Sequence, residues 1–461
     1  DYSKLSQGIT VTLANEAKVK VVVGTEDDTN NDNTIDNAID ASNYSDDYIQ
    51  NIENIIGTNQ VDNITGDTAN NEINGLDGDD ILRGASGSDT LTGGNDNDQL
   101  FGGNDNDELY GNDNDDKLFG GANDDKLYGG NGVDSLIGDD GADTLYGGAQ
   151  SDTLFADKGN DILYGGTDTV SGNEIDEINF SGSSSKITVD LRDDNDLAGN
   201  INSDGFGTAI GTGIGTDKIK DIENVTGSTL DDTITGDSNV NILNGGEGDD
   251  IFAIKALEVA VDTIDGGTSG VAAKGDTIDY SAITGDHHIE VDLENDGITT
   301  TSRIIDENDA ANRDKYRVNI VNVENINGTD KNDIITGNES ANILTGNAGD
   351  DEIKGEGGKD TLDGSTGDDT LEGGAGADEI IGGTDVNGDY VSYASDNTGV
   401  IVNLKSGTNT GGDAQGDSIS GIEHILGGLA NDELTGNDAN NTIKGGTGQD
   451  TLFGGAGDDI L

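Results

Sequence analysis

Aspartate recurs at a spacing of nine residues through segment 57–164 of this chain. It holds the sixth position of every nine-residue unit there except one, in which Asn71 takes that place. Repeated carboxylates beside the main-chain carbonyls of turns are the all-oxygen ligands that calcium prefers. The binding of a hard metal cation is therefore the first chemistry to consider. Because carboxylate pairs occur throughout, none of them singles out an acid/base pair, and we predict no catalytic and no organic cofactor-binding residues.

The other positions of each unit indicate how these aspartates are held. Glycine dominates positions one, two and four, where it supplies backbone angles with positive φ. Asn and Asp tolerate those angles better than most residues and replace glycine at position four of several units. The eighth position is always Ile or Leu. We therefore predict a six-residue turn followed by a three-residue strand with one apolar side chain pointing inward.

A single strand of this length buries nothing alone, so the units must stack. Two units make one coil of eighteen residues, with turns on alternate edges and two thin sheets facing each other. Successive turns on one edge then lie about 4.8 Å apart, and carboxylates eighteen residues apart in sequence converge. Without a cation these stacked carboxylates would repel one another.

The clearest unit, residues 129–137, reads GGNGVDSLI and follows the pattern G-G-x-G-x-D-x-U-x, in which U is a large apolar residue. This pattern resembles the RTX (repeats-in-toxin) nonapeptide. The resemblance implies an all-β fold, a right-handed parallel β-roll or β-helix solenoid with calcium-binding turns. The modular arrangement resembles that of large bacterial RTX exoproteins and covers nearly the whole chain.

Strong calcium sites need two good turns eighteen residues apart. We therefore expect the chain to bind multiple calcium ions, about ten or more, with six to eight oxygen ligands each. The predicted metal ligands are Asp80, Asp89, Asp98, Asp107, Asp116, Asp125, Asp134, Asp143, Asp152 and Asp161 in the first block, Asp250 in the second, Asp351, Asp360, Asp369 and Asp378 in the third, and Asp450 and Asp459 in the fourth.

The sequence also contains a longer repeat, each copy of which includes a block of nonapeptides. Alternating strands such as Ile187–Leu191 and Ile289–Leu293 precede a variable acidic loop, an Ile-Glu-Asn-type strand and a new nonapeptide block. We expect the solenoid to continue through these connectors, with separate β-sandwich domains as the alternative. The predicted divisions are a partial connector module at 1–56, roll block 1 at 57–164, a connector at 165–226, a short block 2 at 227–265, a connector at 266–327, block 3 at 328–381, a connector at 382–426 and block 4 at 427–461.

The second unit of every block departs from the motif, because position six is Asn71, Asn241, Asn342 or Asn441. First units are also poor in glycine at position four. Amide and hydroxyl hydrogen bonds can close a turn without metal. We therefore expect the first coil of each block to bind calcium weakly or not at all.

Composition restricts the partners and the compartment. The 461 residues contain 94 Asp and Glu against 22 Lys and Arg, a net charge of −72, which disfavours nucleic acid and anionic membranes. So acidic and weakly apolar a chain is expected to be disordered without calcium. Cysteine is absent and there is no apolar run that could span a bilayer, so metal rather than disulfides must stabilise the fold. A fold that needs millimolar calcium belongs outside the cell, at a bacterial surface.

Targeting features are sparse. Methionine is absent and the sequence stops inside a nonapeptide, so we interpret it as a mature piece or fragment of a longer protein. The RTX resemblance implies export by type I secretion, although the C-terminal signal of that pathway is not visible.

Two groups of side chains fall outside the calcium pattern. The three histidines are His287 and His288, which we expect in a solvated turn rather than at a transition metal, and His424, which takes the place of Asn in the other modules. Aromatic residues favour position nine, so Tyr110, Tyr128, Tyr146 and Tyr164 should stack on one face. That ladder either stabilises the sheet or forms a lateral contact surface.

Three function classes remain. The favoured one is a self-assembling or adhesive surface protein, such as an S-layer, fibre or adhesin shaft, whose partner is another copy or a neighbouring module of the same protein. The alternative is the calcium-binding secretion and folding region of a secreted enzyme, such as a protease, lipase or epimerase. An ice-binding roll is disfavoured, because position three carries no ladder of a single residue type. No G-x-S-x-G, H-E-x-x-H or P-loop motif appears, so we predict that the chain itself is not an enzyme.

Overall fold

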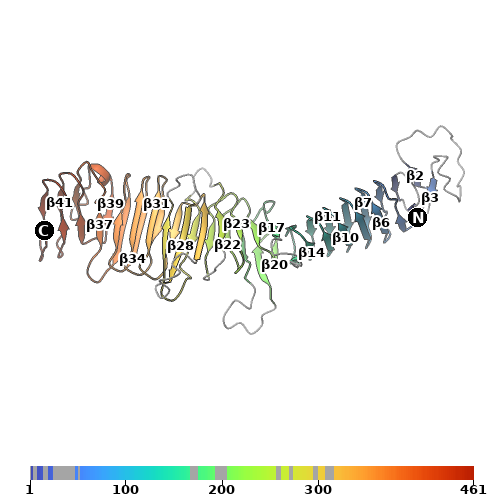
Figure 1. The fold of residues 1–461 in the computed structure, drawn as a ribbon, viewed down its shortest axis with the longest axis horizontal. Coiled ribbons are helices and arrows are strands. Elements are labelled where there is room, and N and C mark those ends of the chain that lie inside the picture. Colours follow the sequence, from blue (N-terminus) through green and yellow to red (C-terminus); the bar gives the residue numbers. More distant parts are fainter. Residues whose placement is uncertain are drawn as a thin grey trace. The chain divides into compact units, whose positions relative to one another are not determined.

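The computed structural model describes residues 2–3, 8–13, 19–23, 47–49, 52–166, 175–192, 205–255, 261–268, 274–293, 300–306 and 316–461. The variable acidic loops expected within the connectors fall largely outside these residues. The chain divides into two compact units, Asp1–Thr229 and Leu230–Leu461. In each unit, successive strands stack as the rungs of a solenoid (Figure 1).

The first block is built from short strands joined by glycine-rich turns. Each strand pairs in parallel with the strand two further along the chain, and partner residues are eighteen apart. Odd- and even-numbered strands therefore form opposite faces of one flattened coil, as predicted. The strands are β4 (Asn54–Ile56), β5 (Asn63–Thr65), β6 (Glu72–Asp77), β7 (Ile81–Ser86), β8 (Thr90–Asn95), β9 (Gln99–Asn104), β10 (Glu108–Asp113), β11 (Lys117–Ala122), β12 (Lys126–Asn131), β13 (Ser135–Asp140), β14 (Thr144–Ala149), β15 (Thr153–Phe155) and β16 (Ile162–Gly166).

The core is the column of eighth-position residues. Leu91, Leu109 and Leu127 on one face, and Leu100 and Leu118 on the other, are 0 % exposed. Complete burial of one leucine or isoleucine per strand contributes roughly 1.5–3 kcal/mol each. The core is only two side chains thick, so the turns on its two edges must contribute to stability as well.

Turn geometry follows the glycine pattern. Gly94, Gly103 and Gly130 at position two have φ values between 121° and 134°. Asp96 and Asn114 at position four adopt φ of 74° and 80°, which confirms that Asp and Asn replace glycine in the left-handed region.

The connector of the first unit continues the same stack. β17 pairs in parallel with β15 and then with β21, while β20 pairs in parallel with β16. The inserted strands β18 and β19 form antiparallel pairs beside β20. The remaining strands of this unit are β1 (Ile9–Thr12), β2 (Val19–Val23), β3 (Asp47–Ile49), β17 (Glu177–Asn179), β18 (Ile187–Asp190), β19 (Gly207–Gly211), β20 (Gly215–Lys220) and β21 (Asn224–Thr226).

The second unit repeats this plan with shorter blocks. Its strands are β22 (Thr233–Thr235), β23 (Ile242–Asn244), β24 (Ile251–Ala253), β25 (Asp262–Asp265), β26 (Thr277–Asp279), β27 (His287–Asp292), β28 (Thr300–Asp306), β29 (Tyr316–Val321), β30 (Asn325–Asn327), β31 (Ile334–Asn338), β32 (Ile343–Thr345), β33 (Glu352–Glu356), β34 (Thr361–Thr366), β35 (Thr370–Glu372), β36 (Glu379–Thr384), β37 (Tyr390–Ser392), β38 (Ile401–Asn403), β39 (Ser418–Ser420), β40 (His424–Leu426), β41 (Glu433–Thr435), β42 (Ile443–Lys444) and β43 (Thr451–Phe453), with one 3₁₀ turn at Gly412–Ala414.

Connectors of the second unit are also part of the solenoid. On one face β25 pairs with β29 and β27 with β31, both in parallel, and the hairpin strand β28 lies between β27 and β29. On the other face β24, β26, β30 and β32 follow one another in parallel. The fold is therefore a parallel β-roll joined by β-strand connectors, as predicted. The alternative of separate β-sandwich domains does not agree with these pairings, because the connector strands pair in parallel with strands of the roll.

Candidate metal centre

Two columns of aspartates run along the turns, one on each edge of the roll. Within the blocks, the backbone N–H of an aspartate donates a hydrogen bond to Oδ1 of the aspartate eighteen residues later, and at block ends the acceptor lies further along the chain. Asp98 donates to Asp116 over 2.7 Å, and Asp116 donates to Asp134 over 2.8 Å. The same bond links Asp351 to Asp369 over 2.8 Å in the third block. Each carboxylate is thus fixed in orientation by the neighbouring coil.

The other carboxylate oxygen, Oδ2, is buried and accepts no hydrogen bond in most of these residues. A buried ionised oxygen without a partner is costly, and each such group calls for an explanation. The predicted ligands with this property are Asp80, Asp89, Asp98, Asp107, Asp116, Asp125, Asp134, Asp143, Asp250, Asp351, Asp360, Asp369 and Asp378.

The space beside Oδ2 is kept open by the glycine at position one. A side chain on Gly111 would collide with Oδ2 of Asp116 and with the carbonyl oxygen of Gly129 in the next coil. A side chain on Gly355 would meet Asp360 and Gly373 in the same way. Carboxylate and carbonyl oxygens therefore face one space in these two turns. This all-oxygen donor set fits calcium, which takes six to eight oxygens at about 2.3–2.6 Å.

The pKa values of the column aspartates also indicate a cation site. The pKa values of Asp80, Asp116 and Asp125 are raised to about 8, mainly by burial and also by neighbouring carboxylates, while the hydrogen bond from the backbone amide opposes the shift. Burial likewise raises the pKa of Asp98 and Asp143 to about 7. Near neutral pH these groups resist ionisation unless a cation compensates the charge.

The remaining predicted ligands occupy the same position with different surroundings. Asp152 and Asp161 are buried, and their Oδ1 atoms accept the amides of Asp134 and Asp143. Asp450 and Asp459 accept amides over 3.1 and 3.0 Å but are only half-buried. The structure therefore places every predicted ligand in an aspartate column of its own block.

Three further aspartates join the columns although we did not predict them as ligands. The buried Oδ2 atoms of Asp217, Asp276 and Asp389 also lack a hydrogen-bond partner. Asp276 and Asp389 close the lengthened turns that end blocks 2 and 3, and Asp217 lies within the connector strand β20. Each stands two residues before a buried apolar residue, such as Ile219 after Asp217, and this Asp-x-apolar spacing is the signal that could have found them.

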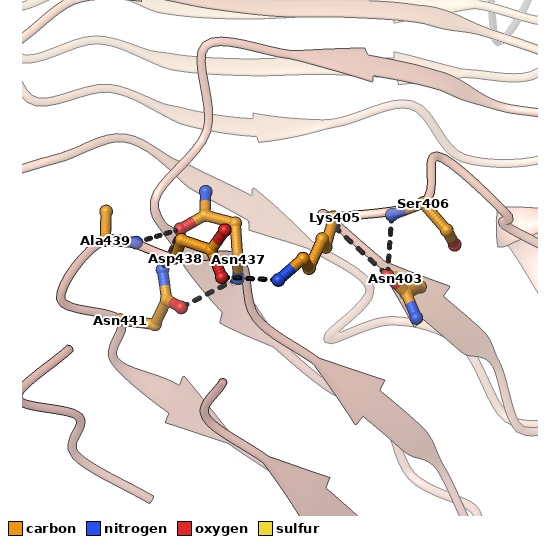
Figure 2. A network of polar contacts seen from close by, with 7 residues as sticks. All are labelled: Asn403, Lys405, Ser406, Asn437, Asp438, Ala439 and Asn441. Atoms are coloured by element: carbon orange, nitrogen blue, oxygen red, sulfur yellow. Dashed lines mark hydrogen bonds and ion pairs between the residues drawn. The ribbon is translucent and has the colours of Figure 1, made fainter. Parts of the chain in front are cut away.

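At two asparagine turns, hydrogen bonds within the protein satisfy the side chain at this position. The side-chain N–H of Asn441 donates to the carbonyl of Glu423 over 2.7 Å, and its Oδ1 accepts the amide of Asn437 in its own turn. Figure 2 shows this turn beside the ion pair of Lys405 with Asp438. Asn342 donates to Glu324 over 2.6 Å in the same manner. Asn71 differs, since its side-chain N–H has no partner.

First units of the blocks also satisfy their aspartates internally. Both Oδ1 and Oδ2 of Asp333 accept hydrogen bonds, from the amide of Ile289 and from the amide and hydroxyl of Thr329. Asp62 accepts the amide and hydroxyl of Thr58. These contacts give a physical reason for the prediction that first coils bind calcium weakly, although binding itself stays a prediction.

The histidines and the tyrosine ladder lie within the strands and their hydrogen-bond networks. His424 Nδ1 accepts the amide of Thr442, and Nε2 lies 3.0 Å from the carbonyl of Asn387, so the ring fills an asparagine slot as expected. His287 and His288 begin β27 rather than lying in a turn before it. The rings of Tyr110, Tyr128, Tyr146 and Tyr164 stack at centroid distances of 4.7–4.9 Å.

Comparison with protein families identifies these turns. The model of the RTX calcium-binding nonapeptide repeat matches residues 56–170, in overlapping copies, and also 221–253, 323–353, 354–387 and 426–461. These segments make up more than half of the chain.

The chain belongs to the RTX calcium-binding nonapeptide-repeat family. The repeats of this RTX protein bind calcium, and their number implies several ions. No curated protein matches the chain. Among the residues that the structure describes, no helix is long and apolar enough to cross a membrane.

Proposed function

We propose that this RTX protein is an extracellular structural protein at a bacterial surface, which folds when calcium fills its aspartate columns after secretion. The observation that carries the proposal is the repeated buried Oδ2 oxygen without a hydrogen-bond partner, found in all of the first three blocks and in the connectors. Calcium bridging two successive turns would convert ligand binding into folding free energy. The proposed ligands are the column aspartates, including Asp217, Asp276 and Asp389.

Two features support a structural role: the continuous stacking of blocks and connectors, and a ladder of tyrosines on one face. Connector strands pair with roll strands, so that block and connector share one stack within each unit. The half-buried tyrosine ladder on β10, β12, β14 and β16 offers a lateral surface for another copy of the protein. The alternative, the folding region of a secreted enzyme, would use the same calcium-dependent folding without this lateral contact.

The test compares calcium with chelator. We expect circular dichroism of the protein in millimolar calcium to show β-structure, and an excess of chelator to convert the spectrum to that of a disordered chain. Magnesium should restore it poorly, because it demands octahedral geometry and retains its waters. A β spectrum that persists in chelator would refute calcium-dependent folding.

Light scattering and electron microscopy of the same samples test assembly. We expect filaments or sheets in calcium that dissolve in chelator. Replacing Tyr128 and Tyr146 with serine should reduce assembly while leaving the calcium-dependent spectrum intact. A folded monomer in calcium at all concentrations would favour the enzyme-associated role.

A further inference from the structure

A cluster of three carboxylates lies where the third block meets its connector. The turn from β36 to β37 runs from Gly382 to Asp389, two residues longer than the same part of a nonapeptide. Tyr390 of β37 pairs with His424 of β40, so Asp389 and Glu423 occupy successive places in one column. Glutamate therefore replaces aspartate at this step of the column.

The three side chains converge. One carboxylate oxygen from each of Asp385, Asp389 and Glu423 lies within 4.8 Å of the other two. Glu423 Oε2 also accepts the backbone N–H of Asp389 over 3.2 Å. Asp385 is exposed and Glu423 half-buried, so the cluster opens to solvent on one side.

Asp389 shows that this cluster has an unmet requirement for a ligand. It is 0 % exposed; its Oδ1 accepts the amide of Asp369 over 2.8 Å, and its Oδ2 has no hydrogen-bond partner. A side chain on Gly382 would collide with this Oδ2 and with the carbonyl oxygen of Gly421, so those two oxygens face the same space. Among the described residues, no lysine or arginine forms an ion pair with the three carboxylates.

The inserted part of the turn is held in place. Asp368 accepts the amides of Val386 and Asn387 over 2.9 and 2.7 Å. Asn387 in turn offers its carbonyl to the His424 ring. Asp385, directly before this anchored segment, is thereby fixed close to Glu423.

We propose that Asp385, Asp389 and Glu423, with the Gly421 carbonyl, form a calcium site that ties the third block to its connector. All its donors are oxygens, and three carboxylates so close together repel strongly without a divalent cation. The site differs from the nonapeptide sites because one ligand is a glutamate and another comes from an inserted loop. Asp389, Gly421 and Glu423 also lie outside the segments that match the family model. This site rests on the proposed function, because Asp389 is one of its column aspartates, and it adds Asp385, Glu423 and the Gly421 carbonyl as ligands.

The preceding junction provides a comparison within the same unit. Glu324 accepts the amide of Asp276 over 2.9 Å, as Glu423 does from Asp389. Oδ2 of Asp276 is also buried without a hydrogen-bond partner. No third carboxylate joins this pair among the described residues. The site at Asp385 should therefore bind calcium more tightly than the junction at Asp276.

Histidine provides a local probe, because the chain has only three and His424 adjoins the cluster. The full chain would be labelled selectively with ¹⁵N-histidine and titrated with calcium, while circular dichroism follows the overall fold and elemental analysis counts bound calcium. We expect the His424 signal to show a calcium-dependent step. In Asp385→Asn this step should shift to about tenfold or higher calcium, with about one ion fewer bound per chain.

Two further variants define the result. Glu423→Gln keeps an acceptor for the Asp389 amide and should shift the His424 step as Asp385→Asn does. Glu379→Gln, an exposed carboxylate outside the cluster, should leave it unchanged. Equal steps in Asp385→Asn, Glu379→Gln and the parent chain, with equal calcium counts, would overturn the site. A His424 step without a change in circular dichroism would support the site and refute calcium-dependent folding.

Discussion

Two successive turns of the third block close in opposite ways. At Asn342 the side-chain amide donates to the Glu324 carbonyl, so every polar atom of that group is satisfied within the protein. At Asp360, the next turn of the same column, Oδ2 is buried with no partner. The backbone N–H of Asn342 even donates to Asp360 Oδ1 over 2.8 Å, as it would from an aspartate turn. The two kinds of turn thus differ in one side-chain atom, which is an amide nitrogen with a hydrogen-bond acceptor at Asn342 and a carboxylate oxygen without a donor at Asp360.

We infer from this difference that a roll of one geometry can need calcium at its aspartate turns and not at its asparagine turns. The asparagine turns follow the connectors, where a glutamate precedes them by eighteen residues in each block. In blocks 3 and 4 the aspartate and asparagine of the first coil are therefore satisfied by hydrogen bonds from protein groups. Such coils offer a template on which calcium-filled coils can stack.

Acidification should distinguish the two kinds of turn most strongly. In the folded, metal-free protein, burial raises the pKa of Asp80 and Asp116 to about 8 and that of Asp89 and Asp134 to about 6, above the ordinary value of 3.8. Groups with raised pKa stabilise the fold when protonated; this contribution is complete below the ordinary pKa of 3.8 and is lost as pH rises from there through the raised pKa values of about 6 to 8.

We therefore expect the calcium-free protein to gain β-structure as pH falls from 8.5 towards 5, and to lose it on return. Circular dichroism in chelator against pH is the measurement. Calcium affinity should change in the opposite direction, since protons compete for the same oxygens. A metal-free chain that is equally unstructured at both ends of this range would contradict our account of the columns.

Single aspartates should matter less, but measurably. Asp116→Asn keeps the acceptor for the Asp98 amide while removing a charged oxygen from the column. In calcium we expect the free energy of unfolding to fall by about 1–3 kcal/mol. Calorimetry in saturating calcium would detect this as a drop of several degrees in Tm. The matched control is Asp115→Asn, an exposed neighbour that removes the same charge, and equal losses in both variants would argue for general charge effects.

The reverse exchange should make an amide turn depend on calcium. Asn342→Asp places a carboxylate against the Glu324 carbonyl, where the amide now donates over 2.6 Å. We expect a loss of about 1–2 kcal/mol at low calcium, partly recovered at high calcium. The informative quantity is the slope of Tm against calcium concentration, which should be steeper than in the parent chain. An unchanged slope would show that the residue at position six does not decide metal binding.

The smallest effect is expected for the substitution of His424 by asparagine. Asn325 performs the same task in the preceding module, where its Oδ1 accepts the Ile343 amide over 2.8 Å. His424→Asn should therefore change stability by less than about 1 kcal/mol. His424→Leu leaves the Thr442 amide without an acceptor and should cost about 1–3 kcal/mol. Chemical denaturation in calcium compares the two, and equal losses would mean that the ring serves for packing alone.

Most of the fold was predictable because the nonapeptide fixes the period, the turns and the inward residue at the same time. The parallel pairing at eighteen residues and the leucine core follow directly from that register. The connectors were harder, because inserted residues break the spacing and hide position-six residues such as Asp217. The partners of each side chain were not predictable either. That Asp62 is satisfied by Thr58 while Asp80 has a free Oδ2 depends on hydrogen-bond geometry that residue type alone does not determine.

Turns with an aspartate at position six should bind calcium, whereas turns with an asparagine there should close by hydrogen bonds without a metal ion. A crystal structure of the calcium-loaded protein, with ions located by anomalous scattering, tests this claim directly. We predict ions beside the Oδ2 atoms of the aspartate columns, as between Asp98 and Asp116 or Asp351 and Asp369. We predict none at the turns of Asn342 and Asn441. Ions at those asparagine turns, or aspartate turns without ions in saturating calcium, would contradict the account.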